Sequence, residues 1–184
     1  MIEISEYIEI NGIKQYVLIT GNENGPLMLF LHGGPGVSQI GFIRKYQSKL
    51  EKKFLVVNWD QRGAGKSNIK KFSRKELTID NIINDAISLI KILRERFKKT
   101  HVYLIGHSFG SLIGIILAQK IPQYIKVYIS VGQVVNINEA DKVTYKLLSQ
   151  KIKKENNKKG INILKKIGKP PYVTKDSIRN LDKL

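Results

Sequence analysis

The sequence GHSFG at residues 106–110 holds the first candidate for chemistry. An apolar run typical of a strand leads into it, and an apolar run typical of a helix follows. A serine at such a sharp turn stands exposed at the carboxyl edge of a sheet, where the Phe109 amide and the positive helix end favour an oxyanion. We expect Ser108 to be a nucleophile, flanked by Gly106 and Gly110 because a Cβ there would clash with the neighbouring strand and helix. The alternative is a helix start of small residues without chemistry.

A second motif, His32-Gly33-Gly34-Pro35-Gly36, directly follows another apolar run. Its three glycines let backbone N–H groups approach a ligand closely, and the proline stiffens the loop. We expect the loop to bind substrate and the Gly34 amide to be the second oxyanion donor. For His32 we favour a structural imidazole that organises the loop over a catalytic base.

The third motif is DQRGAGKS at residues 60–67. Its last three residues could be mistaken for a phosphate-binding loop, but that loop requires a glycine where Asp60 stands, and no helix pattern follows. We therefore reject nucleotide binding and predict a buried turn tied by Asp60 and Arg62. Either residue could also border the floor of the active site.

The elements that must position these motifs alternate along the chain. Asn11-Gly12 predicts a tight hairpin turn between the first two strands. The later apolar runs alternate with helical patterns, which predicts an α/β fold with an N-terminal antiparallel hairpin and a mostly parallel sheet flanked by helices. The expected strands are 4–10, 13–20, 27–31, 54–57, 102–105 and 125–131, and the expected helices are 38–50, 79–97 and 111–120.

The composition changes near Asn136, and we expect two parts. Residues 1–135 form the α/β core, whereas residues 136–184 are rich in lysine and show helical patterns at 139–154 and 160–168. The second part is interpreted as the start of a helical cap or as a tail.

The overall composition indicates a globular protein. The chain has 184 residues, is 42% hydrophobic and contains no cysteine, which excludes a thiolate nucleophile and a cysteine-ligated metal site. The net charge of +17 comes from 26 lysines and only 6 arginines, so it is weak evidence for nucleic-acid recognition, which relies on arginine. We therefore expect no nucleic-acid partner. We also expect a cytoplasmic protein without membrane association, because the sequence shows neither a signal sequence nor an apolar span.

Together the three motifs resemble the α/β-hydrolase fold, and within it the proline iminopeptidase branch of serine peptidases. The resemblance covers about residues 5–135. It implies that Ser108 is the nucleophile, that the amides of Gly34 and Phe109 form the oxyanion hole, and that no metal or organic cofactor is needed. It also implies release of N-terminal residues, often proline, from peptides. Related branches are esterases, acyltransferases and amidases, so a small peptide, amide or ester is the expected substrate.

The chain departs from this family where the catalytic partners of the serine are expected. The order along the chain should be Ser, then Asp or Glu, then His, but no histidine follows Ser108. The triad Asp and His are therefore not identifiable, and the final strands that would carry them are missing. We expect a chain with little activity alone, a non-catalytic remnant, or a subunit completed by a C-terminal chain or a homo-oligomer. Acidic residues do follow Ser108, but we assign the triad role to none of them: Glu139, Asp141, Glu155, Asp176 and Asp182.

Overall fold

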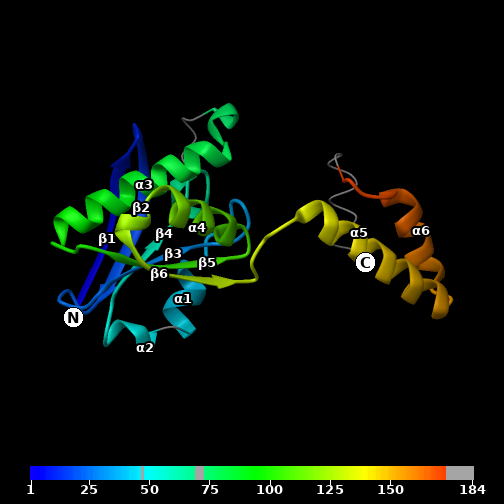
Figure 1. Cartoon of the computed structure of the whole chain (residues 1–184), viewed down its shortest axis with the longest axis horizontal. Helices are drawn as coiled ribbons and strands as arrows, with labels where there is room; N and C mark the ends of the chain where they lie inside the picture. Colours follow the sequence, from blue (N-terminus) through cyan, green and yellow to red (C-terminus); the bar gives the residue numbers. More distant parts are fainter. Residues whose placement is uncertain (47, 69–72, 173–184) are drawn as a thin grey trace. The chain divides into compact units, whose positions relative to one another are not determined.

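The computed structural model describes residues 1–46, 48–68 and 73–172 (Figure 1). The chain divides into two compact units, Met1–Val134 and Val135–Leu184. None of the described helices is long and apolar enough to cross a membrane.

The first unit is built on one six-stranded sheet, in the order β1-β2-β4-β3-β5-β6. The first two strands form the expected hairpin, because Asn11 and Gly12 adopt the φ values of +48° and +77° that its tight turn requires. The second strand pairs antiparallel with the fourth. The third, fourth, fifth and sixth strands run parallel to one another. The strands are β1 (Ile2–Ile10), β2 (Ile13–Gly21), β3 (Leu27–Leu31), β4 (Leu55–Trp59), β5 (Val102–His107) and β6 (Ile125–Val131).

Helices cover both faces of this sheet, which confirms the predicted α/β architecture (Figure 1). Helices α3 (Ile79–Arg96) and α4 (Phe109–Lys120) pack on one face, where the larger hydrophobic core lies. The other face carries α1 (Ile40–Tyr46) and α2 (Ser48–Glu51) over a smaller core around Met28 and Phe30 of β3 and Val56 of β4. The single helix expected over 38–50 is thus two short ones. Short 3-10 turns are η1 (Gly65–Ser67), η2 (Arg74–Glu76) and η3 (Pro122–Tyr124).

Within residues 135–172, the described part of the second unit, the chain forms two helices, α5 (Ile137–Lys154) and α6 (Lys158–Ile167). Each begins at an asparagine whose side chain accepts a hydrogen bond from the first helical turn, Asn136 from the Glu139 amide and Asn157 from the Gly160 amide. A Cβ on Gly160 would lie only 3.0 Å from the side chain of Ile152, so glycine allows the two helices to approach closely.

Candidate active site

Ser108 stands between β5 and α4 in a backbone conformation that residues with a side chain rarely adopt. Its φ is +50° and its ψ is −117°. Two backbone hydrogen bonds hold the turn: the Ser108 amide donates to the carbonyl of Val131 at the end of β6, and its carbonyl accepts from the Ser111 amide, each at 2.8 Å. The strand-to-helix transition therefore fixes Ser108 at the carboxyl edge of the parallel strands.

The two flanking glycines are required by close packing, as expected from the sequence. A Cβ on Gly106 would lie 2.6 Å from the carbonyl oxygen of Gly110 in α4, and a Cβ on Gly110 would lie 2.0 Å from the carbonyl oxygen of Leu31 in β3. Both distances are far below van der Waals contact with backbone atoms that cannot move freely. The turn can form only because neither position carries a side chain.

The glycine loop after β3 lies directly against this turn. A Cβ on Gly33 would be 3.2 Å from the Cβ of Ser108 and 3.0 Å from Nδ1 of His107. The next residue, Gly34, is exposed and has a φ of +114°, which favours glycine. The fold therefore brings together two motifs that lie more than 70 residues apart in the sequence, and it leaves the loop's backbone beside Ser108.

His32 has the structural position that the sequence favours for it. The side chain is 2% exposed, its Nε2 accepts a hydrogen bond from the Gln61 amide at 3.0 Å, and its Nδ1 lies 2.8 Å from the carbonyl oxygen of Gly33. An imidazole that accepts at Nε2 carries its proton at Nδ1 and donates it to Gly33, so the ring is neutral. Burial lowers the pKa of His32, opposed by the Gly33 carbonyl and the charge of Asp60. Both ring nitrogens are engaged, so His32 braces the loop and is not a base for Ser108.

Gln61 completes this brace, although its residue type and position give no sign of this role in the sequence. Besides its amide contact, its side-chain Nε2 donates to the carbonyl of His32 at 3.0 Å. Its neighbour Asp60 is buried and accepts a hydrogen bond from the Lys66 amide through Oδ2 at 2.9 Å, while its Oδ1 is buried without a hydrogen-bond partner among the described residues. The third motif is thus a buried turn, as predicted, and it supports the glycine loop from behind.

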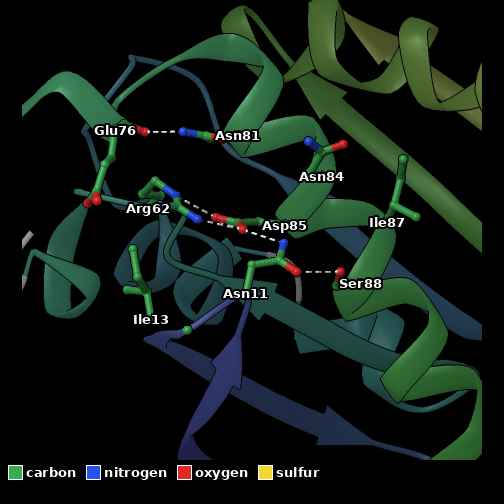
Figure 2. Close-up of a pocket in the computed structure, with 10 residues that line it drawn as sticks. Asn11, Ile13, Arg62, Glu76, Asn81, Asn84, Asp85, Ile87 and Ser88 are labelled. Carbon is green, nitrogen blue, oxygen red and sulfur yellow. Dashed lines mark hydrogen bonds and ion pairs between the residues drawn. The ribbon is translucent and has the colours of Figure 1, made fainter.

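The hydrogen bonds of Arg62 join a second cluster of polar side chains around Asp85. Arg62 lines a separate pocket of about 610 Å³, and no residue of the GHSFG turn or the glycine loop lines that pocket. Figure 2 shows Arg62, Asp85 and Asn11 pointing toward one another from the loop after β4, from α3 and from the β1–β2 turn.

Asp85 is the centre of this second cluster. Its carboxylate accepts two hydrogen bonds from Arg62, at 2.7 and 2.8 Å, and one each from Asn11 at 2.8 Å and Gln15 at 2.7 Å. The hydrogen bond to Asp85 raises the pKa of Arg62 above its ordinary value. Sequence reasoning missed Asp85, although an acid within the apolar stripe of a predicted helix is a signal that could have found it.

No imidazole in the described part of the chain hydrogen-bonds Ser108. His107 is exposed and its Nδ1 lies 2.7 Å from Nε2 of Gln39, while His101 pairs with Thr100 at the opposite end of β5. Of the downstream acids, Glu139 forms an exposed ion pair with Lys142 at 2.6 Å. Asp176 and Asp182 lie outside the described residues. The described residues also contain no group of three side chains that could hold a metal ion.

Comparisons with known proteins identify the fold family of the chain. A family model described as alpha/beta hydrolase fold matches residues 26–159. The chain is 39% identical to "Probable aminopeptidase YbaC" of Bacillus subtilis (strain 168) over 98% of its own length and 56% of that relative, and 28% identical to "Proline iminopeptidase" of Thermoplasma volcanium over 82% of its length and 50% of that relative.

A solved structure shows the same likeness. The proline iminopeptidase-related protein TTHA1809 from Thermus thermophilus superposes with a TM-score of 0.68 at 27% identity, over 81% of this chain and 51% of that protein. The chain thus spans about half the length of the relatives it matches. Because this family model matches well over half of the chain and the sheet has the expected α/β arrangement, the chain belongs to the α/β-hydrolase fold family.

Proposed function

We propose that this chain carries the nucleophile and the oxyanion hole of a serine hydrolase of the proline iminopeptidase type. The observation that carries the proposal is Ser108 at a positive φ, at the start of α4, with the Gly33 backbone against its Cβ. In this geometry the Phe109 amide belongs to the first turn of α4, where N–H groups have no intrahelical acceptor. The Gly34 amide belongs to the loop on the other side of the serine.

The chemistry is acyl transfer. The Oγ of Ser108 attacks the carbonyl carbon of the scissile amide, and the amides of Gly34 and Phe109 stabilise the negative oxygen of the tetrahedral intermediate. The hydroxyl proton passes through a general base to the leaving amine, which departs as the acyl-enzyme forms. Water then attacks the ester carbonyl, and Ser108 recovers its proton as the acid is released.

The substrate class comes from the relatives. Those described above are named as an aminopeptidase and a proline iminopeptidase, so we propose a peptide with a free N-terminal residue, proline favoured. An esterase or amidase acting on a small acyl compound is the alternative, because the acyl-transfer step is the same.

The general base is the component that the described residues do not provide. His32 is locked by two hydrogen bonds, and neither His101 nor His107 pairs with Ser108. A serine hydroxyl without a base is a weak nucleophile, although an oxyanion hole alone retains some rate enhancement. We therefore expect the isolated chain to turn over proline p-nitroanilide barely above background.

A fluorophosphonate probe tests the serine independently of turnover. Incubated with the purified chain for many hours and mapped by peptide mass spectrometry, it should label Ser108 slowly. The label should disappear in Ser108→Ala and persist in the control Ser130→Ala, which removes an exposed hydroxyl from β6. Labelling of another serine, or no labelling at all, would contradict a preformed site at Ser108. Rapid cleavage of the anilide, lost in Ser108→Ala, would show that this chain contains its own base.

A further inference from the structure

A basic groove lies at the amino edge of the parallel strands, where β5 and β6 begin (Figure 1). Two adjoining pockets of about 400 and 210 Å³ form it, and both are lined by Lys99 and Thr100. Glu95 is the one acidic side chain among the described residues that line these pockets, whereas five side chains are cationic. The cations are Lys91, Arg94, Lys98, Lys99 and Lys126.

These cations are not needed to close the end of α3. Lys98 has a φ of +52°, its amide donates to the Glu95 carbonyl at 3.2 Å, and the Lys99 amide donates to the Arg94 carbonyl at 2.8 Å. This pair of hydrogen bonds is a Schellman motif, in which backbone groups satisfy the carbonyls at a helix end. The cationic side chains around the groove are therefore available to a ligand.

Arg94 is held in a fixed orientation that leaves its two terminal nitrogens available. Its Nε donates to the Thr100 carbonyl at 2.8 Å, and its Cζ lies 3.8 Å from the centre of the Tyr124 ring. Within the described part of the chain, neither Nη group of Arg94 hydrogen-bonds another residue, and none of the five cations forms an ion pair. A planar guanidinium fixed in this way is suited to bidentate binding of an oxyanion.

We propose that the basic groove binds a short chain of phosphate groups, such as an inorganic oligophosphate, with Arg94 holding one phosphate and the lysines holding its neighbours. Arginine binds phosphate in a bidentate manner, and lysine binds it as a point charge. The helix dipole favours cations in the last turn of α3, but Lys126 lies on β6 and gains nothing from it.

The density of positive charge favours phosphates over an acidic peptide. Successive side chains of an extended peptide point to opposite sides, so its carboxylates on one side are about 6.6 Å apart. A phosphate chain carries a charge on every unit and brings more negative charge into two small adjoining pockets. An acidic peptide is therefore the weaker candidate and is included in the test.

The groove is separate from the candidate active site. Strand β5 runs for six residues, from Val102 to His107, which places about 20 Å between the groove and Ser108 at about 3.3 Å per residue. The proposal is thus independent of the proposed function. Ser108→Ala should bind tripolyphosphate as tightly as the unchanged chain, and loss of binding in this variant would place the phosphates at the nucleophile and overturn the proposal.

The main test is calorimetric titration of the full chain with tripolyphosphate at about 0.15 M ionic strength, where long-range attraction is screened. Arg94→Lys keeps the net charge but loses the bidentate group, and it should weaken binding about tenfold. Arg44→Lys makes the same change in α1, on the other face of the sheet, and should leave the affinity unchanged. Non-specific attraction to a net charge of +17 would affect both variants alike, and that result, or no binding at all, would overturn the proposal.

A second pair of variants keeps the test decisive if Arg94→Lys fails to fold, since Arg94 also contacts Thr100 and Tyr124. Lys91→Gln removes one charge from the groove, and Lys45→Gln removes one charge from α1. Circular dichroism checks that each variant is folded. Lys91→Gln should weaken binding several-fold and Lys45→Gln should not, whereas equal affinities would contradict binding in the groove.

Other ligands define the chemistry that the groove recognises. Inorganic phosphate and a hexa-aspartate peptide should each bind about tenfold more weakly than tripolyphosphate, because neither places several charges across both pockets. ATP should bind no more tightly than tripolyphosphate, because the proposal gives the base no contact. Tighter binding of ATP, or binding of phosphate or the peptide as tight as that of tripolyphosphate, would overturn recognition of a phosphate chain.

Discussion

At the scale of single residues, the candidate site depends on groups that do no chemistry themselves. His32 is the clearest example, because its neutral ring joins the glycine loop to the turn after β4 through hydrogen bonds with Gly33 and Gln61. If Nε2 carried a proton, it would point at the N–H of Gln61, and two hydrogen-bond donors would face each other in the buried interior. The neutral form is therefore a condition of the loop's geometry.

This brace predicts how stability depends on pH. Burial lowers the pKa of His32 from 6.5, so the folded state binds the proton more weakly than the unfolded state. The stabilisation is complete above pH 6.5 and is lost as the pH falls toward the lowered value. Urea unfolding between about pH 7 and 5 should show a decline in the free energy of unfolding that is shallower in His32→Gln. His101→Gln, which removes an exposed imidazole, should keep the steeper decline, and equal declines in all three would refute the brace.

The glycines of the Ser108 turn predict a second residue-scale effect. Gly110→Ala forces a methyl group against the Leu31 carbonyl and should lower the free energy of unfolding by about 1–3 kcal/mol. Gly41→Ala makes the same chemical change in α1, where nothing lies within 4 Å, and should be neutral or stabilising by about 0.5–1 kcal/mol. Urea denaturation midpoints measure both, and similar losses would argue against close packing at the turn.

At the scale of elements, one buried ion pair connects three parts of the first unit. Asp85 lies in α3, Arg62 in the loop after β4, and Asn11 in the β1–β2 turn, and all meet in the pocket of Figure 2. The Arg62 and Asp85 side chains are 6% and 0% exposed, so each charge depends on the other for its compensation. The cluster positions the hairpin and α3 relative to the motif that supports the glycine loop.

Breaking this pair should therefore be costly. Asp85→Asn leaves the Arg62 guanidinium buried without a counter-charge, and we expect a loss of about 3–5 kcal/mol of stability. Glu3→Gln is the matched control: it breaks the exposed pair with Arg44, also 2.7 Å long, and should cost about 0.2–1 kcal/mol. Chemical denaturation of both variants gives the comparison. Equal costs would mean that the Asp85 cluster is not a structural tie.

At the scale of the whole molecule, the net charge of +17 is the most prominent property. It is mostly lysine, and the family and the site give it no role in the proposed reaction. We expect only non-specific binding to duplex DNA, with a dissociation constant of about 10⁻⁴–10⁻⁶ M at physiological salt, equal for unrelated sequences. Fluorescence anisotropy with two unrelated duplexes measures this. A nanomolar affinity for one of them would reveal a specific nucleic-acid partner.

The sequence by itself determined the features that depend on short spacing. The Asn11-Gly12 hairpin, the order of strands and helices, and the glycine requirement on both sides of Ser108 all follow from periodicity and turn chemistry within a few residues, and the structure confirms them. Only the tertiary structure decided which distant groups meet. Gln15 and Asp85 are 70 positions apart, Gln61 and His32 are 29 apart, and no local pattern encodes either contact. Such pairs depend on how the helices and strands pack, because a buried polar group must find its partner wherever the folded backbone brings one within reach.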